Sequence, residues 1–111
     1  MSFTTSKKAG GVIVIKCPPR LDINVSDDLK NIMTDLIEKK KYKIIIDLTH
    51  TKYIDSSGLG AIVSRIAVTR SNGGDVRLAT TTPAILNLLD LTHLNKILSC
   101  FDNIPTAVNS F

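Results

Sequence analysis

Residues 43–48 read KIIIDL, and this run of three isoleucines constrains the fold more than any other part of the sequence. A short β-branched segment without polar alternation is typical of a strand that is covered on both faces, as in a parallel sheet. Parallel strands need long crossover connections, which are usually helices. The segment therefore predicts an α/β fold with a central strand at 43–48.

Other short segments that are rich in β-branched or apolar residues and bounded by turn residues indicate further strands. These segments lie at 12–17 and 75–80, with weaker edge strands at 2–8 and 97–101. The strand at 2–8 would pair with the next one in a hairpin, and it would therefore run antiparallel to the others. We expect a mixed, mostly parallel sheet of four to five strands.

Helices are predicted where apolar residues recur every three or four positions between these strands. The predicted helices run from the N-cap Asn24 to about Lys40, from Ser56 and Ser57 to Asn72-Gly73-Gly74, and onward from Thr82-Pro83, with a short turn within 103–109. Right-handed crossovers pack such helices against the sheet. The chain is thus expected to form a single α/β domain, residues 1–111, with about four helices.

Composition argues against several classes of function. The net charge is +4, but Lys39, Lys40, Lys41 and Lys43 cluster at the end of the first predicted helix, where cations complement the helix dipole. Aromatic residues make up 5%, too few for a base-stacking surface, so no nucleic-acid partner is expected. No apolar stretch has the length of a signal sequence or a membrane span, so we expect a cytoplasmic protein without membrane insertion.

Catalytic and metal-binding patterns are missing from the sequence. Neither serine of KYIDSSGLGAIV, residues 52–63, lies in the G-x-S-x-G pattern of a hydrolase, and the glycine patterns of nucleotide sites are incomplete. His50 and His93 are expected to be structural or solvent-facing. Cys17 and Cys100 have no companion ligands at zinc spacing, so they are interpreted as small buried residues. We therefore expect no catalytic residue and no metal.

The stretch 52–63 begins the second predicted helix with a set of small polar residues. Either Asp55 or Ser56 can cap the helix by accepting hydrogen bonds from its free first-turn N–H groups. Either cap would leave the Ser57 hydroxyl free at the positive end of the helix. A phosphate added there would lie beside free N–H groups, so the domain could be modified without unfolding. The residues that follow are expected to serve the turn and the packing of the helix: Gly58, Leu59 and Gly60.

Residues 47–63, DLTHTKYIDSSGLGAIV, resemble the characteristic segment of the STAS family, in particular its bacterial anti-sigma factor antagonists. The likeness extends to VIVIKCPPRLDI at 12–23 and to GGDVRLATTTPAILNLLDLTHLNKIL at 73–98, so it covers nearly the whole chain. The resemblance implies that the predicted α/β domain is STAS-like.

In that family the second serine of Asp-Ser-Ser is phosphorylated by an anti-sigma factor that is also an ATP-dependent serine kinase. The resemblance therefore implies that Ser57 is the phosphoacceptor. The unphosphorylated protein would bind the anti-sigma factor and free a sigma factor, phosphorylation would release it, and a metal-dependent serine phosphatase would restore it. ATP and magnesium would belong to the kinase, so the chain itself is expected to need no cofactor and to be a binding module, not an enzyme.

The residues around the acceptor are expected to lie beside the site or to contact the partner: Asp22, Asn24, Asp55, Ser56, Gly58, Leu59 and Gly60. By the family's motif, Asp55 is the acid before the serines. Asp22 is the acid of the Leu-Asp turn, and it would either position the acceptor or only close that turn.

Two departures from the family pattern concern the partner surface. Pro18-Pro19-Arg20 stands where the family usually has a glycine before Leu-Asp, which would stiffen the loop beside the site. The C-terminal helix is also shortened. An alternative of a different class is a STAS interaction module in a transport or signalling complex, or a ligand sensor, that no phosphate switches. The hydroxyl of Ser57 favours the phosphorylated antagonist, because a constitutive module does not need it.

Overall fold

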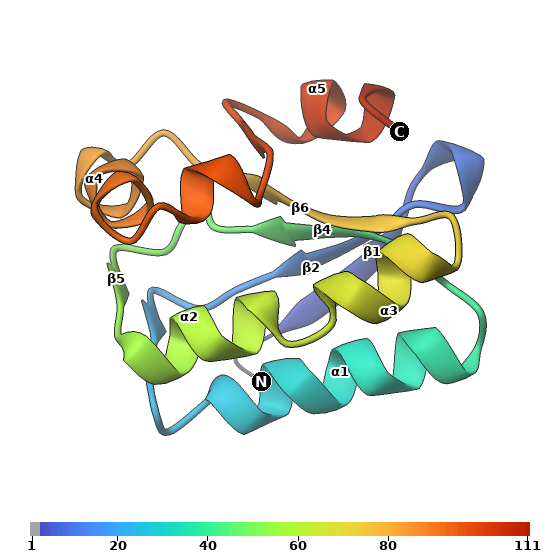
Figure 1. Cartoon of the computed structure of the whole chain (residues 1–111), viewed down its shortest axis with the longest axis horizontal. Coiled ribbons are helices and arrows are strands. Elements are labelled where there is room, and N and C mark those ends of the chain that lie inside the picture. Colours follow the sequence, from blue (N-terminus) through green and yellow to red (C-terminus); the bar gives the residue numbers. More distant parts are fainter. Residues whose placement is uncertain (1–2) are drawn as a thin grey trace.

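A five-stranded sheet with the order β1-β2-β4-β6-β7 forms the centre of the computed structural model, which describes residues 3–111 (Figure 1). Its strands are β1 Thr4–Lys7, β2 Ile13–Lys16, β4 Lys43–Asp47, β6 Asp75–Ala79 and β7 Cys100–Phe101. β1 pairs antiparallel with β2, and all other pairs of this sheet are parallel. The mixed sheet is thus confirmed, while the part of the predicted edge strand on residue 2 lies outside the described residues.

Strand β4 lies in the middle of the sheet, and its three isoleucines pack on both sides of it. Ile44 and Ile46 are fully buried in the larger apolar cluster of the protein. Ile45 is fully buried in a smaller cluster on the opposite face, together with Ala107 of the last helix. Complete burial of each isoleucine side chain stabilises the fold by about 1.5–3 kcal/mol. The double coverage that the isoleucine run predicts is confirmed.

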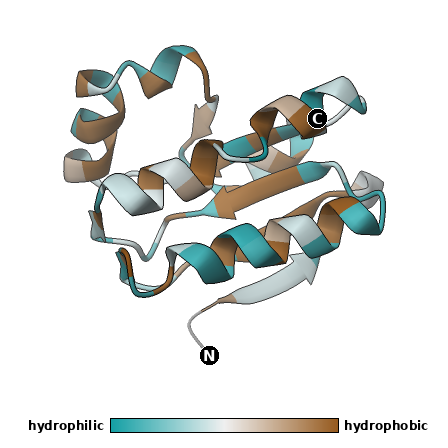
Figure 2. Cartoon of the chain, turned by 60° about the horizontal axis from the view of Figure 1, so that its bottom comes forward, coloured by the Kyte–Doolittle hydropathy of each residue, from teal (hydrophilic) through white to brown (hydrophobic). Residues whose placement is uncertain are grey.

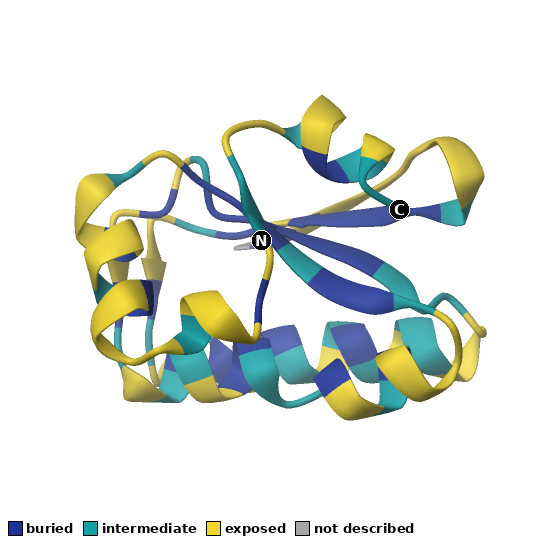
Figure 3. Ribbon diagram, turned by 45° about the horizontal axis from the view of Figure 1, so that its top comes forward, coloured by how far each residue is buried: buried dark blue, intermediate teal, exposed yellow. Residues whose placement is uncertain are grey.

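In residues 3–111 five α-helices surround the sheet: α1 Ser26–Glu38, α2 Ser56–Val63, α3 Ile66–Ser71, α4 Pro83–Leu91 and α5 Ile104–Asn109. Figure 1 shows α1, α2 and α3 on one face of the sheet and α5 on the other. Figure 2 shows that the sheet centre is hydrophobic and that much of α1 is hydrophilic. The central strands β2, β4 and β6 are mostly buried, whereas the edge strand β1 and the outer sides of the helices are exposed (Figure 3). Each helix is therefore amphipathic in the sense that the sequence period predicts.

The helix predicted after Ser57 is not continuous, because it breaks at Ser64 and Arg65 into α2 and α3. The Ser64 hydroxyl donates to the carbonyl of Ala61 at 2.7 Å, and Arg65 leaves helical geometry with φ −118° and ψ 10°. The Arg65 guanidinium turns toward α1 and donates to the Thr34 hydroxyl at 3.0 Å. A serine hydroxyl that bonds a preceding carbonyl competes with the regular helix, and apolar spacing does not reveal such a competition.

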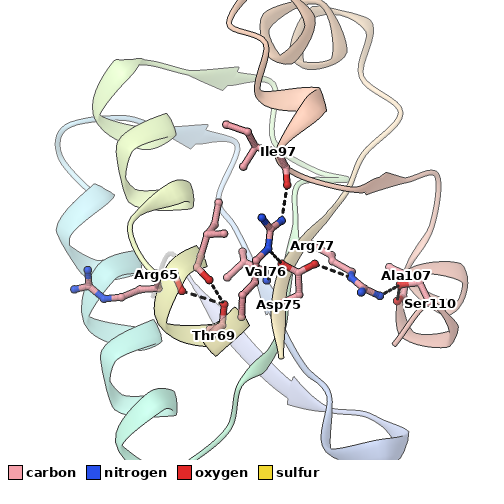
Figure 4. A network of polar contacts seen from close by, with 10 residues as sticks. Arg65, Thr69, Asp75, Val76, Arg77, Ile97, Ala107 and Ser110 are labelled. Atoms are coloured by element: carbon pink, nitrogen blue, oxygen red, sulfur yellow. Dashed lines mark hydrogen bonds and ion pairs between the residues drawn. The ribbon is translucent and has the colours of Figure 1, made fainter. Parts of the chain in front are cut away.

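Asp75, at the start of β6, connects several elements through its carboxylate. It accepts hydrogen bonds from Arg70 Nε at 2.8 Å and from Arg77 Nε at 3.1 Å. Arg70 also donates to the carbonyl of Ile97, and Arg77 donates to the Ser110 hydroxyl at 2.7 Å (Figure 4). Hydrogen bonds to charged groups are the stronger kind in proteins. The network therefore holds α3 and the short C-terminal helix against the same strand.

A second, two-stranded sheet was not predicted. β3 Arg20–Leu21 pairs in parallel with β5 Tyr53–Ile54, and the carbonyl of Pro19 accepts the N–H of Lys52 at 2.8 Å. Strands of two residues carry no periodicity, so a sequence pattern cannot indicate them. This sheet places the segment 20–24 beside the beginning of α2, although the two are separated by about thirty positions in the chain.

Candidate functional site

Asp55 is the N-cap of α2 and the central residue of the candidate site. Its Oδ1 atom accepts the backbone N–H of Gly58 at 2.9 Å and the hydroxyl of Ser57 at 2.5 Å. Its Oδ2 atom accepts the backbone N–H of Ile23, from the segment after β3, at 3.0 Å. Of the two predicted candidates, the structure therefore assigns the cap to Asp55, whereas Ser56 is exposed.

The Ser57 hydroxyl lies in the first turn of α2, as predicted, but the prediction that it is free is wrong. The side chain is half-buried, and the hydroxyl donates a hydrogen bond to the Asp55 carboxylate. The prediction assumed that a cap serves only the helix backbone. A carboxylate has lone pairs enough to accept from the backbone and from a neighbouring hydroxyl at once. The contact fixes the position of the hydroxyl oxygen at the positive end of the helix.

Asp22 closes the turn that leads into α1. Its Oδ1 atom accepts the backbone N–H of Asn24 at 3.1 Å, and its Oδ2 atom lies 3.5 Å from Arg20 Nε. Its backbone carbonyl accepts the N–H groups of Val25 and Ser26 at 3.1 and 2.9 Å. Among the described residues the Asp22 carboxylate has no hydrogen bond with Ser57. Of the two predicted roles of Asp22, the turn-closing one is therefore seen.

Asn24 is not the N-cap of α1, which corrects the prediction. The N-cap position belongs to Val25, which makes no side-chain capping bond, and Asn24 is exposed. The carbonyl of Asp22 accepts N–H groups that a capping side chain would otherwise satisfy. An aspartate that bonds its own backbone two residues on sets such a turn, and it displaces the asparagine from the capping position.

Gly58 and Gly60, both predicted to give clearance, differ in their surroundings. A Cβ atom at Gly58 would lie 2.3 Å from the Leu21 backbone oxygen and 2.9 Å from Ile54 Cγ2. A Cβ atom at Gly60 would meet nothing within 4 Å. The close packing of Gly58 is confirmed, and the same expectation for Gly60 is wrong because that face of α2 is exposed. Leu59 is partly buried against the larger cluster, as predicted.

Exposed side chains from β3, from β5 and from the segment after β3 lie near the cap, and no sequence pattern groups them into one surface. Ile23 is 70% exposed and Tyr53 is 45% exposed, and the guanidinium of Arg20 stacks 4.4 Å from the centre of the Tyr53 ring. We call Arg20, Ile23, Tyr53 and Ser57 the acceptor rim. Exposed apolar side chains near one polar group are typical of a surface that binds another protein. Only the pairing of β3 with β5 brings these residues together.

The hydrogen bonds of Asp55 lower the pKa of its carboxyl group. The Ser57 hydroxyl contributes most, and the N–H groups of Gly58 and Ile23 add to it. Each of these donors stabilises the ionised carboxylate relative to the neutral acid. At neutral pH the site therefore contains a carboxylate anion in direct contact with the serine hydroxyl.

We expect the variant Asp55→Asn to show a pH-dependent loss of stability. A pKa that is lower in the folded state stabilises the fold above the pKa of the unfolded chain, about 3.9, and this contribution disappears as the pH falls through the folded pKa. Urea denaturation should therefore show wild type more stable than Asp55→Asn at pH 7, with a difference that narrows below about pH 4.

The matched control is Asp27→Asn, which removes a first-turn carboxylate of α1 that is 88% exposed and lies 4.0 Å from Lys30. Its difference from wild type should be smaller than that of Asp55→Asn at pH 7, because exposed ion pairs contribute little. A difference for Asp55→Asn that is constant from pH 7 to pH 3 would contradict the role of the charged cap.

Other reactive groups lie away from this site. Burial raises the pKa of the Cys17 thiol, with the Asp47 charge adding to it, and burial also raises that of the half-buried Cys100. His50 and His93 are exposed. Within residues 3–111 no three histidine, cysteine or acidic side chains are placed to share a metal ion. Over the same range no helix is both long and apolar enough to cross a membrane.

Comparison with known proteins gives a match over almost the whole chain. The family model described as STAS domain matches residues 4–107. An anti-sigma F factor antagonist of Paenibacillus polymyxa is 31% identical over 99 residues, which are 88% of this chain and 85% of that protein. These residues include the site described above.

Solved structures share the arrangement of helices and strands. A Thermotoga maritima protein described as a candidate anti-sigma factor antagonist has a TM-score of 0.87 at 26% identity, over 97% of this chain and 92% of that one. The Bacillus cell fate determinant SpoIIAA, solved in its phosphorylated form, has a TM-score of 0.76 at 17% identity over 97% of each chain. At that identity the second likeness shows the fold alone, a mostly parallel sheet flanked by helices.

Proposed function

Because the chain belongs to the STAS domain family, we propose that it is an anti-sigma factor antagonist and that phosphorylation of Ser57 releases it from its partner. The single observation that carries the proposal is the position of the Ser57 hydroxyl. It is half-buried at the N-terminal end of α2, held by Asp55 and close to exposed apolar side chains. A hydroxyl in that position can be reached by a kinase and can also be covered by a docked partner.

Phosphorylation would reverse the electrostatic interaction at the cap. The hydroxyl oxygen of Ser57 lies 2.5 Å from Asp55 Oδ1, and the proton between them makes the contact attractive. A phosphate would remove that proton and add about 1.5 to 2 negative charges. Two anions at this separation repel each other, so either the carboxylate or the phosphate must move outward. The change is strongest at the surface that the partner covers.

The displacement of Asp55 would also reach the segment after β3. Asp55 Oδ2 is the acceptor for the backbone N–H of Ile23, whose side chain is 70% exposed on the acceptor rim. If the Asp55 carboxylate turns away from a phosphate on Ser57, this hydrogen bond between the N-cap of α2 and the segment 20–24 is lost. One modification would therefore change both the charge of the rim and the support of its most exposed apolar side chain.

The proposed switch requires Ser57 to lie inside the interface with the partner. A switch from 99% bound to 99% free needs about 5.5 kcal/mol of differential binding free energy. A charge on the edge of an interface supplies much less, whereas an unpaired charge buried by a partner costs about 2–5 kcal/mol or more. The repulsion between the phosphate and the Asp55 carboxylate adds to that cost, and so does the loss of the hydrogen bond from the Ile23 N–H to Asp55. The partner would therefore have to cover the acceptor rim itself.

The remaining chemistry would belong to the partners. The proposed kinase is the anti-sigma factor, which would bring ATP and magnesium, and a metal-dependent serine phosphatase would remove the phosphate. Arg20 of the acceptor rim is 66% exposed, so it can contact an acidic group of a partner in addition to Asp22, whose Oδ2 atom lies 3.5 Å from Arg20 Nε. The role of this chain would be that of a substrate and a binding surface.

The proposal is tested by incubating the protein with the candidate anti-sigma kinase and ATP, followed by intact mass and peptide mapping. Wild type should gain one phosphate, located at Ser57, and Ser57→Ala should gain none. Ser56→Ala is the matched control, because it removes the adjacent exposed hydroxyl, which among the described residues donates no hydrogen bond to the Asp55 carboxylate. It should be phosphorylated like wild type.

A gain of phosphate that survives Ser57→Ala would contradict the proposal, and so would no gain with a kinase that binds the protein. The second outcome would favour the alternative of a STAS interaction module that no phosphate switches. In that case the acceptor rim would serve constitutive assembly in a transport or signalling complex, and Ser57 would act only in the cap.

A further inference from the structure

A hollow of about 190 Å³ lies at the end of the sheet where the parallel strands begin. The first turn of α2 with Ser57 lies at the opposite end. Three connections line the hollow: the turn with Gly10 and Gly11 between β1 and β2, the segment 40–43 between α1 and β4, and the turn with Asn72 and Gly73 between α3 and β6. Figure 1 shows these connections together at the same end of the sheet. We call this site the lysine hollow.

The charge of the lysine hollow is positive and uncompensated. Lys40, Lys41 and Lys43 line it, and within residues 3–111 none of the three takes part in an ion pair. No acidic residue is part of its lining. Asp75, the cross-strand neighbour of Lys43, is already occupied by two arginines. Cations gathered from one short segment around a concave site attract anions, because the surrounding protein focuses their field.

The helix dipole explains only part of this cluster. α1 ends at Glu38, so Lys39 and Lys40 lie near the negative end of its dipole. Lys43, by contrast, is the first residue of strand β4 and lies four positions beyond the C-cap of α1, while the end of α3 lines the same hollow through Asn72 and Gly73. An anionic ligand would engage Lys43 together with the lysines next to α1.

The backbone around the lysine hollow is shaped for close approach. Of the five residues with positive φ in the described chain, four line it: Gly10, Gly11, Lys40 and Gly73. At the three glycines a Cβ atom would meet nothing within 4 Å, so the backbone is open toward the hollow. The N–H groups of Lys40, Lys41 and Gly73 already donate to backbone carbonyls at the ends of α1 and α3, so the lysine ammonium groups are the donors available to a ligand. Lys40 is notable because glycine is the favoured residue for its position after a helix, with φ 61°.

We propose that the lysine hollow binds a small anion that carries two or three phosphate groups. The volume is below the roughly 300–1,000 Å³ that is typical of sites for drug-sized ligands, which favours a compact ligand. Three lysine ammonium groups supply the several donors that phosphate oxygens need. The ligand would bind at the opposite end of the parallel strands from Ser57, so this inference does not depend on the proposed switch.

The test is an NMR titration of the ¹⁵N-labelled full chain with inorganic tripolyphosphate at constant ionic strength. Saturable shifts should appear at the amides of Gly10, Gly11, the segment 40–43 and Gly73. The variant Lys40→Gly/Lys41→Gln/Lys43→Gln should bind about tenfold more weakly or worse, since each exposed charge contact contributes roughly two- to fivefold. Lys52→Gln, which removes an exposed lysine next to β5, is the matched control and should bind like wild type.

The single variant Lys40→Gly separates binding from folding. Glycine relieves the positive φ at this position, so the melting temperature should rise while tripolyphosphate affinity falls two- to fivefold. Shifts that do not saturate, or that appear equally at Lys52, would overturn the proposal. So would unchanged affinity in the triple variant, or sedimentation with phosphatidylglycerol vesicles without any tripolyphosphate binding, because the hollow would then serve a lipid surface.

Discussion

Replacing Ser57 by aspartate should lower the affinity of the protein for its anti-sigma factor about a hundredfold, whereas Ser57→Ala should keep it within a few fold. The new carboxylate would stand next to Asp55, where the serine now donates a proton at 2.5 Å. A charge that a partner buries without compensation costs about 2–5 kcal/mol of binding free energy. A hundredfold loss of affinity corresponds to about 2.7 kcal/mol, in the lower part of this range. Isothermal titration calorimetry with the candidate anti-sigma factor measures both variants.

A single carboxylate should have a smaller effect than the phosphate, which carries more charge and bulk. The control is Ser56→Asp, which places the same charge one residue earlier on an exposed side chain without a contact to Asp55. It should weaken binding by less than the variant at Ser57. Equal losses for the two aspartate variants would contradict a special role of Ser57, and no loss for either would contradict the electrostatic basis of the proposed switch.

Gly58→Ala should destabilise the fold by about 3 kcal/mol, a typical upper value for forcing an atom into a packed site. The new methyl group would lie 2.3 Å from the Leu21 backbone oxygen, which a side-chain rotation cannot relieve. The same oxygen accepts the Asp55 N–H at 3.3 Å, so the backbone shift would also disturb the cap. Urea denaturation followed by circular dichroism gives the change in the free energy of unfolding.

Gly60→Ala is the matched control in the same helix. A Cβ atom there meets nothing within 4 Å, and alanine is more favourable than glycine in a helix by about 0.5–1 kcal/mol. We therefore expect Gly60→Ala to be slightly more stable than wild type. Two variants with equal and small effects would show that α2 does not pack against β3 as closely as the structure has it.

The candidate site was predictable in its parts but not in its connections. A cap at Asp55 or Ser56, Ser57 in the first helical turn and Gly58 in close packing follow from residue types next to one another in the chain, and the structure assigns the cap to Asp55. The hydrogen bond from Ser57 to Asp55 was missed, because a pattern of caps treats each side chain separately. Asn24 was assigned to a cap that the backbone of Asp22 makes unnecessary.

The acceptor rim shows most clearly what sequence patterns cannot predict, namely which distant segments lie side by side. Arg20, Ile23 and Tyr53 belong to two segments that come together only because two residues of β3 pair with two residues of β5. Neither strand is long enough to produce alternation, and the motifs that contain them do not indicate that they pair. The break of the second helix at Ser64 is of the same kind, because it depends on a side chain that reaches the backbone and on Arg65 turning to α1.

The α/β fold follows from local sequence patterns, because the isoleucine run of β4 needs cover on both faces and the helical periods between the strands provide it. The sequence also placed an acidic cap, a serine and a glycine at the start of one helix, because these features depend on neighbours within four residues. Only the tertiary structure decided what lies beside Ser57 and what lines the lysine hollow. Both sites combine loops that are distant in the chain, and the pairing of strands alone sets which loops meet.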